Sequence, residues 1–314
     1  MNRKWTRFLV FSLIAVLFCG CGAVNSSTTT EQDDIQEVAA DDAAYEEEMA
    51  SHLKNLYDFK NENVFSIKNY KEYMPLASIS GLVNGSYATI VPDDEFDFPQ
   101  GGCTDGKYVY LAMTDDNSTF KITKVDMKTW EIVDRSEALY LGHANGMTYN
   151  SRTHQLVIAN DTANHYKEIF FMNPDTLTIT GEKTLTMDIA TIAYNATRDQ
   201  YIVADNSEHF YVLDADFYEI LYDDGHYVNL SPQDCDCDDN YIYIGNTGVS
   251  KDPGLEVVKV YSWDGEYKGI FKMELQQEHE ALFNYDGKYY VTFVMGKGVG
   301  IWEIQYDFNW LAQE

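Results

Sequence analysis

The sequence contains few prolines and few basic residues. Its 314 residues include 6 prolines and 22 lysines and arginines, against 51 aspartates and glutamates, so the formal net charge is -29. A surface this acidic repels the phosphates of DNA, RNA and anionic lipid headgroups, which excludes a nucleic-acid partner and electrostatic binding to membranes. It attracts cations instead, including Ca²⁺ and basic peptides.

Several signatures of enzymes are also missing. The chain has no phosphate loop, no nucleophile elbow, no serine, histidine and aspartate in a hydrolase order and no pair of Cys-x-x-Cys motifs. Aromatic residues are plentiful, with 24 tyrosines and 16 phenylalanines within a hydrophobic share of 45%. This composition favours pleated, half-buried surfaces around one sizeable core, so we expect a β-rich protein.

The N-terminus lacks an apolar run long enough to span a bilayer. Phe8–Phe18 is apolar over about eleven residues, where a spanning helix needs about 20. Basic residues precede this run, and Gly20-Cys21 follows it in a pattern that resembles a bacterial lipobox. We therefore predict a signal peptide over residues 1–20 and lipidation, including palmitate, on Cys21. The protein would then be anchored outside the cytoplasm on a bacterial cell membrane. Cys19 as the acceptor, an ordinary secretory signal and an uncleaved anchor are the alternatives.

Two further segments precede the main domain. Residues 21–42 are rich in serine and threonine and then in acidic residues, without an apolar period, which predicts a disordered acidic tether. Residues 43–97 are predicted to hold a short helix, ending near Phe59, and then one strand.

The strongest signal is an internal repeat. Five similar segments begin at steps of 43, 46, 44 and 45 residues, each with turn residues followed by three short β-type runs. A period near 45 with three or four strands is typical of propeller blades. The predicted fold is all-β: a five-bladed β-propeller over residues 98–314. The five segments begin at Gln100, His143, Ile189, Gln233 and Glu278.

The fifth repeat is short of an outer strand. Only Tyr306–Glu314 follows its third strand, so we expect an N-terminal strand, Ser86–Pro92, to pair into the last blade and close the ring. A sixth blade built from residues 60–97 is the alternative.

Polar side chains cluster where the first strand of each repeat begins. Because these strands line the central channel of a propeller, their side chains are candidate site residues. His143, His279 and Glu278 are candidates for acid–base catalysis. Gln100, Asn145 and Asp188 are candidates for ligand binding. Asp234, Asp236 and Glu280 offer hard oxygen ligands that suit calcium. Structural hydrogen bonding between blades and a solvated acidic channel mouth are the alternatives.

Two other residue types are candidates for binding. Cys103 and Cys237 take the repeat position of apolar residues and are interpreted as buried apolar residues, with a zinc site from Cys235, Cys237 and a histidine, or a Cys235–Cys237 bridge, as alternatives. Six aromatic residues could stack on sugars or peptides, although inter-blade packing is the stronger interpretation for the first two tryptophans. They are Trp130, Trp263, Trp302, Tyr149, Tyr194 and Tyr285.

The first blade resembles a known family. Residues 98–102, Phe-Pro-Gln-Gly-Gly, followed by Lys-Tyr-Val-Tyr-Leu-Ala and Ile-Thr-Lys-Val-Asp, are similar to the first blade of the plant-type glutaminyl cyclases. The resemblance implies a five-bladed propeller, with the family's glutamine at Gln100. The family's catalytic glutamate is not matched, because His143-Ala-Asn145-Gly146 occupies its place.

These observations favour a membrane-anchored lipoprotein that binds a glycan, peptide or protein around its central channel. An extracytoplasmic enzyme, cyclotransferase-like or hydrolytic, that uses the axial histidines and carboxylates is the alternative, and a scaffold for a membrane partner is a third.

Overall fold

The computed structural model describes residues 64–66, 75–78, 96, 98–115, 119–162, 166–225, 231–247, 255–274, 278–294, 299–304 and 306. All of them belong to one compact unit, residues 59–314. The predicted signal peptide, Cys21, the predicted tether and the predicted helix all lie outside the described residues. Within the described residues, no helix has the length and apolar character needed to cross a membrane.

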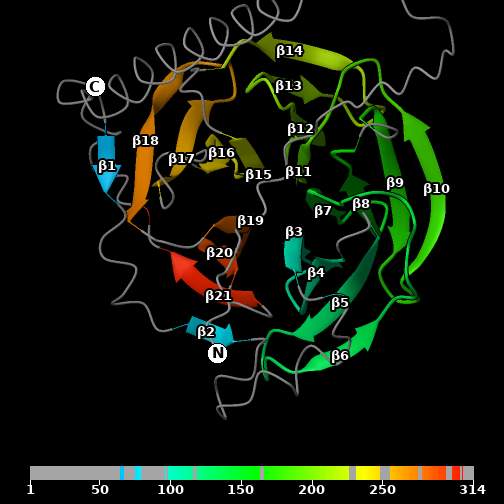
Figure 1. Cartoon of the computed structure of the whole chain (residues 1–314). Helices are drawn as coiled ribbons and strands as arrows, with labels where there is room; N and C mark the ends of the chain where they lie inside the picture. Colours follow the sequence, from blue (N-terminus) through cyan, green and yellow to red (C-terminus); the bar gives the residue numbers. More distant parts are fainter. Residues whose placement is uncertain are drawn as a thin grey trace, which may run out of the picture. The chain divides into compact units, whose positions relative to one another are not determined.

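The strands form five sheets arranged as a five-bladed β-propeller, as predicted. Figure 1 shows the first strand of each blade nearest the centre and the outer strands at the rim. Blade one contains β3 (Phe98–Thr104), β4 (Tyr108–Thr114), β5 (Phe120–Asp126) and β6 (Ile132–Arg135). Blade two contains β7 (Gly146–Asn150), β8 (Gln155–Ala159), β9 (Glu168–Asn173) and β10 (Thr178–Thr184). Blade three contains β11 (Thr191–Asn195), β12 (Gln200–Ala204), β13 (Phe210–Leu213) and β14 (Glu219–Asp223).

The last two blades each take a strand from the N-terminal side. Blade four contains β15 (Ser231–Cys237), β16 (Tyr241–Thr247), β17 (Leu255–Ser262) and β18 (Tyr267–Glu274), with β1 (Val64–Ser66) added in parallel to β18. Blade five contains β19 (His279–Tyr285), β20 (Lys288–Val294), β21 (Val299–Ile304) and β2 (Pro75–Ser78).

An N-terminal strand therefore completes the last blade, but it is not the predicted one. β2 pairs antiparallel with β21, with Ala77 opposite Ile301. The predicted segment Ser86–Pro92 lies outside the described residues, and β2 occupies the position assigned to it. Because β1 and β2 join blades four and five, they do not build a sixth blade. Joining strands from both sides of the repeat region in one sheet covers the edge of β21.

The core is divided among the interfaces between blades. Five clusters of buried apolar residues each draw on two neighbouring blades. In β8, Leu156 and Ile158 pack towards blade one, whereas Val157 and Ala159 pack towards blade three. Because both faces of this strand are buried, its sequence is a continuous apolar run rather than an alternation.

The blades approach most closely at their first strands. A Cβ atom on Gly146 of β7 would lie 2.4 Å from the Cα atom of Thr191 in β11. Only glycine permits this separation. The first strands of neighbouring blades therefore pack against one another around the centre.

The predicted outer hairpin turns are confirmed. The Oδ1 atom of Asp126 accepts hydrogen bonds from the amides of Lys128 and Thr129 at 2.8 and 3.0 Å. Asn173 does the same for the amides of Asp175 and Thr176. Aspartate and asparagine occur here because their short side chains satisfy the amides of a tight turn.

Candidate functional site

A pocket of about 510 Å³ opens where the first strands end. All five blades contribute to its wall, from residues within 103–105, 148–151, 194–197, 236–240 and 283–289. These segments are the ends of β3, β7, β11, β15 and β19 and the hairpins that follow them. The pocket therefore lies at one mouth of the central channel, at the end opposite to the starts of the first strands.

Four of the five hairpins around the pocket share one hydrogen-bonding pattern. The Oδ1 atom of Asp105 accepts hydrogen bonds from the amides of Lys107 and Tyr108, at 2.8 and 2.7 Å. Asp238 does the same in blade four, and Asn150 and Asn195 take the equivalent place in blades two and three. Blade five uses the turn Asp286-Gly287, whose φ values are 52° and 74°. Such left-handed pairs suit two-residue hairpins. The rim of the pocket is thus fixed by local hydrogen bonds and turn geometry.

Three tyrosines from the predicted aromatic set line this pocket. The hydroxyl of Tyr149 lies 2.8 Å from Nδ1 of His154, and the hydroxyl of Tyr194 donates to Asp199 at 2.7 Å. Tyr285 is 46% exposed. Its ring lies over Gly106, where an added Cβ atom would lie 2.1 Å from a ring carbon. The pocket therefore offers aromatic surface from three different blades.

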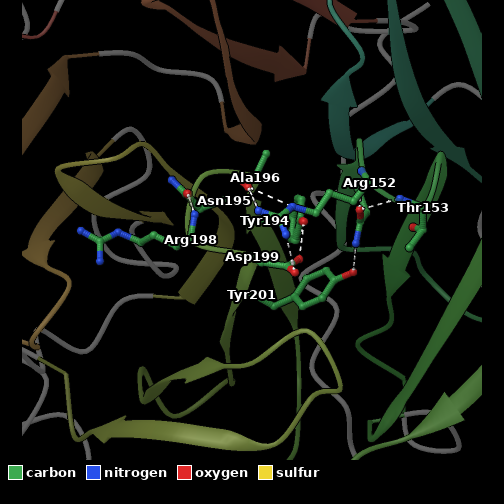
Figure 2. A network of polar contacts seen from close by, with 9 residues as sticks. Arg152, Thr153, Tyr194, Asn195, Ala196, Arg198, Asp199 and Tyr201 are labelled. Carbon is green, nitrogen blue, oxygen red and sulfur yellow. Dashed lines mark hydrogen bonds and ion pairs between the residues drawn. The ribbon is translucent and has the colours of Figure 1, made fainter.

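A polar network connects the rims of blades two and three, as Figure 2 shows. Arg152 forms an ion pair with Asp199 at 2.8 Å, and its Nη2 donates to the carbonyl of Ala196 at 2.9 Å. Asn150 donates to the hydroxyl of Tyr201 in the next blade. This network holds the hairpin that carries Tyr194 against its neighbour.

Asp236 and Asn284 form a polar pair in the pocket wall. The Nδ2 atom of Asn284 lies 2.9 Å from both carboxylate oxygens of Asp236 and donates to the carbonyl of Cys237 at 2.8 Å. Burial raises the pKa of Asp236 to about 7, against the lowering effect of the hydrogen bond from Asn284. A carboxyl group that titrates near neutral pH in a cavity is a typical feature of functional sites.

The residues predicted at the starts of the first strands lie apart from this pocket. Of the nine candidates for catalysis, ligand binding and metal binding, only Asp236 lines it. Gln100 is buried and donates to the carbonyl of Pro99 at 3.0 Å. Asp188 is exposed and lies 3.5 Å from Lys167. His143 and Asn145 contact each other through Nδ1 and Oδ1 at 2.8 Å.

Two of the predicted catalytic residues have contrasting surroundings. His279 is completely buried, and its Nδ1 pairs with the carboxylate of Glu256. Its Nε2 has no hydrogen-bond partner among the described residues and faces the backbone of Gly245. Glu278 is exposed and accepts a hydrogen bond from Gln233 at 2.6 Å. Although the residue as a whole is exposed, the protein around its carboxyl group partly removes that group from water, which raises the pKa of Glu278, and the carboxylate of Glu256 adds to this effect. A substrate in solution has no contact with the ring of His279 in this arrangement.

The carboxylates predicted to bind calcium have different environments. Asp234 is fully buried and accepts hydrogen bonds from Thr191, the amide of Cys235 and the amide of Leu282, at 2.5, 2.8 and 3.1 Å. Burial raises the pKa of Glu280 well above its usual range. No group of three or more metal-ligating side chains occurs among the residues that the structure describes. The carboxyl group of Asp234 is therefore held by hydrogen bonds from the protein itself.

The cysteines and tryptophans have structural environments. Cys103 and Cys237 are buried, unbridged thiols, as interpreted from the repeat, and Cys235 is a third buried, unbridged thiol. Burial raises the pKa of each thiol well above its usual value. Trp263 packs against the cluster between blades three and four, and its Nε1 donates to the carbonyl of Asp238 at 2.9 Å. Trp130 packs against the cluster between blades five and one. Both confirm the inter-blade interpretation.

Sequence reasoning missed most of the polar wall of the pocket. Asn195, Asp238, Asp239 and Asn284 all line it, and none was a candidate. A signal existed, because an aspartate or asparagine follows the first strand of several repeats. That signal predicts a turn as readily as a site.

Comparisons with known proteins give similarity of fold only. No protein-family model and no curated protein sequence matches the chain. Among solved structures, hydrazine synthase from Kuenenia stuttgartiensis is 13% identical, with a TM-score of 0.40 over 63% of this chain and 56% of that chain. BamB from Moraxella catarrhalis is 15% identical, with a TM-score of 0.35 over 65% of this chain and 57% of that chain. This chain therefore matches little more than half the length of either protein. The likeness to glutaminyl cyclases stays a resemblance of the first blade.

Proposed function

We propose that this protein is a membrane-anchored, extracytoplasmic lipoprotein that binds a glycan in the pocket at the hairpin end of its channel. The observation that carries the proposal is the pocket itself, to which all five blades contribute and which contains Tyr149, Tyr194 and Tyr285. Carbohydrates present apolar C–H faces and hydroxyl edges, which match aromatic rings and side-chain amides or carboxylates respectively. The volume of about 510 Å³ falls within the usual range for small-molecule sites.

The anchoring part of the proposal rests on the N-terminal sequence. The short apolar run and Gly20-Cys21 support lipidation. The acidic residues of the tether would keep the propeller away from an anionic membrane surface.

Glycan binding is tested with the full chain purified in detergent. Isothermal titration calorimetry with tetrasaccharides of glucose, N-acetylglucosamine and glucosamine should identify at least one ligand. Tyr285→Ala should weaken that binding by about fivefold or more, since stacking on one aromatic ring contributes about 1 kcal/mol or more. The matched control is Tyr140→Ala, which removes a tyrosine that is 81% exposed and does not line the pocket. Equal losses in both variants, or no ligand at all, would refute the site.

Anchoring is tested separately in cells. Labelled palmitate should be incorporated into the wild-type protein and into Cys19→Ser but not into Cys21→Ser. Labelling that persists in Cys21→Ser would contradict the proposed acceptor.

A further inference from the structure

Four polar side chains of the pocket wall use their hydrogen-bond donors within the protein. The hydroxyl of Tyr194 donates to Asp199 and that of Tyr289 to Asp238. The amide nitrogens of Asn195 and Asn284 donate to Asp239 and Asp236. A ligand in this pocket therefore meets few free donors from these four side chains.

Acceptors remain available in the same wall. The carboxylate of Asp236 shares one amide nitrogen between its two oxygens, and the carboxylate of Asp239 receives one hydrogen bond, on Oδ1 at 3.1 Å, while its backbone carbonyl accepts from Arg198. A carboxylate can accept about four hydrogen bonds, so both groups retain capacity. The pocket is thus rich in acceptors, and it favours a ligand that brings donors.

The charged residues of the pocket wall also favour a ligand that brings hydrogen-bond donors. Four aspartates line the pocket, and no lysine, arginine or histidine does. Two of them, Asp105 and Asp238, are occupied by their own hairpins and by tyrosine hydroxyls. Asp236 and Asp239 have no ion-pair partner in the described structure. Tyrosine rings also attract cations through their faces.

We infer that the glycan carries a protonated amine, as in an oligosaccharide of glucosamine, and that Asp236 and Asp239 recognise this amine. This inference rests on the proposed function, because it names the class of ligand for the same pocket. An ammonium group supplies three donors and a positive charge, which match the two carboxylates with spare acceptor capacity.

The test compares two ligands that differ only in this group. The full chain in detergent is titrated at pH 6.5 with the tetrasaccharide of glucosamine and with its N-acetylated form. Because the pKa of Asp236 is about 7, part of Asp236 is protonated at this pH, and binding of the ammonium favours its ionised form. The glucosamine tetrasaccharide should bind at least tenfold more tightly, because its ammonium replaces an uncharged amide. Asp236→Asn and Asp239→Asn should each reduce this preference severalfold. Asp216→Asn is the matched control: it removes the same charge from an exposed residue outside the pocket and should leave the preference unchanged.

The outcomes of these titrations distinguish failure of the inference from failure of the proposed function. Equal affinities for the two tetrasaccharides would overturn the inference and leave glycan binding intact. If the preference falls equally in all three variants, it arises from the overall charge of the chain and not from the pocket. That result would also overturn the inference. The three variants are Asp236→Asn, Asp239→Asn and Asp216→Asn. Failure of every tetrasaccharide to bind would remove the proposed function and this inference with it. Thermal unfolding of each variant shows whether the pocket is still folded.

Discussion

A buried ion pair joins blades three and four, and its removal gives the sharpest test of how the ring is held together. Lys259 of β17 pairs with Glu208, which lies in the loop between β12 and β13. Their side chains are 0% and 1% exposed. Burial lowers the pKa of Lys259 more than the attraction of Glu208 raises it. The free-energy cost of removing water from the ammonium group therefore exceeds the attraction between the two charges, as is common for buried ion pairs.

We predict that Lys259→Met and Glu208→Met each reduce the free energy of unfolding by about 3–5 kcal/mol, because each removes one charge of a fully buried ion pair. For a domain of this size, about 2–4 °C is lost per kcal/mol, so the melting temperature should fall by roughly 6–20 °C. The double variant should lose far less than the sum of the two, because unbranched methionines fill a similar volume without charge.

The assay is equilibrium urea unfolding followed by circular dichroism, with thermal melts in parallel. The interaction energy of the double-mutant cycle should exceed about 3 kcal/mol in magnitude. Single variants that each lose less than about 1 kcal/mol, or a double variant whose loss equals the sum, would refute the argument that the two charges depend on each other.

Three further predictions concern the pocket, the centre of the ring and cations. The pKa of Asp236 is raised from 3.8 to about 7, so the folded chain binds this proton more tightly than the unfolded chain between those values. Stability from this group is therefore highest below about pH 4, falls by up to about 1.4 kcal/mol per pH unit between about pH 4 and pH 7, and is lost above about pH 7. In urea unfolding at pH 5 and pH 8, Asp236→Asn should show a smaller difference than the wild type; an unchanged difference would exclude Asp236 as its source. Gly146→Ala should lower the melting temperature by at least several degrees, because the added Cβ atom would lie 2.4 Å from the backbone of Thr191. Gly181→Ala is the control: its added Cβ atom would lie 3.7 Å from the nearest neighbouring atom, so the melting temperature should fall far less. Millimolar Ca²⁺ or EDTA should shift the melting temperature by less than about 1 °C, because the carboxylate of Asp234 is held by three protein donors. A ligand at a hundredfold excess over its Kd would add about 2.7 kcal/mol to the free energy of unfolding. A shift of several degrees would therefore show that a cation binds and would contradict this prediction.

The number of blades could be predicted from the sequence because a blade is a local unit. Each consists of consecutive strands joined by short turns, so its turn residues and apolar runs recur at a fixed spacing along the chain. The outer turns at Asp126 and Asn173 and the buried cysteines follow from the same periodicity. These features depend on neighbours that are close in sequence.

The position of the ring closure could be predicted only in part. The missing outer strand of the fifth repeat indicated that an N-terminal segment would pair there. Several segments before blade one have β-type composition, and only pairing across the whole chain selects Pro75–Ser78 for this position. Strand composition indicates that a segment can pair, but not with which partner.

By itself the sequence determined the β-rich composition, the five-fold repeat, the acidic surface and the residues that form tight turns, because these depend on residue type and local spacing. Only the tertiary structure decided which mouth of the channel holds the pocket, why His279 is buried against Gly245, and how Asp236 comes to lie beside Asn284. These features require residues far apart in the sequence to meet across blade interfaces: His279 and Gly245 are 34 residues apart, and Asp236 and Asn284 are 48 apart. The sequence period specifies that such residues are equivalent, but the packing of the ring decides which of them touch.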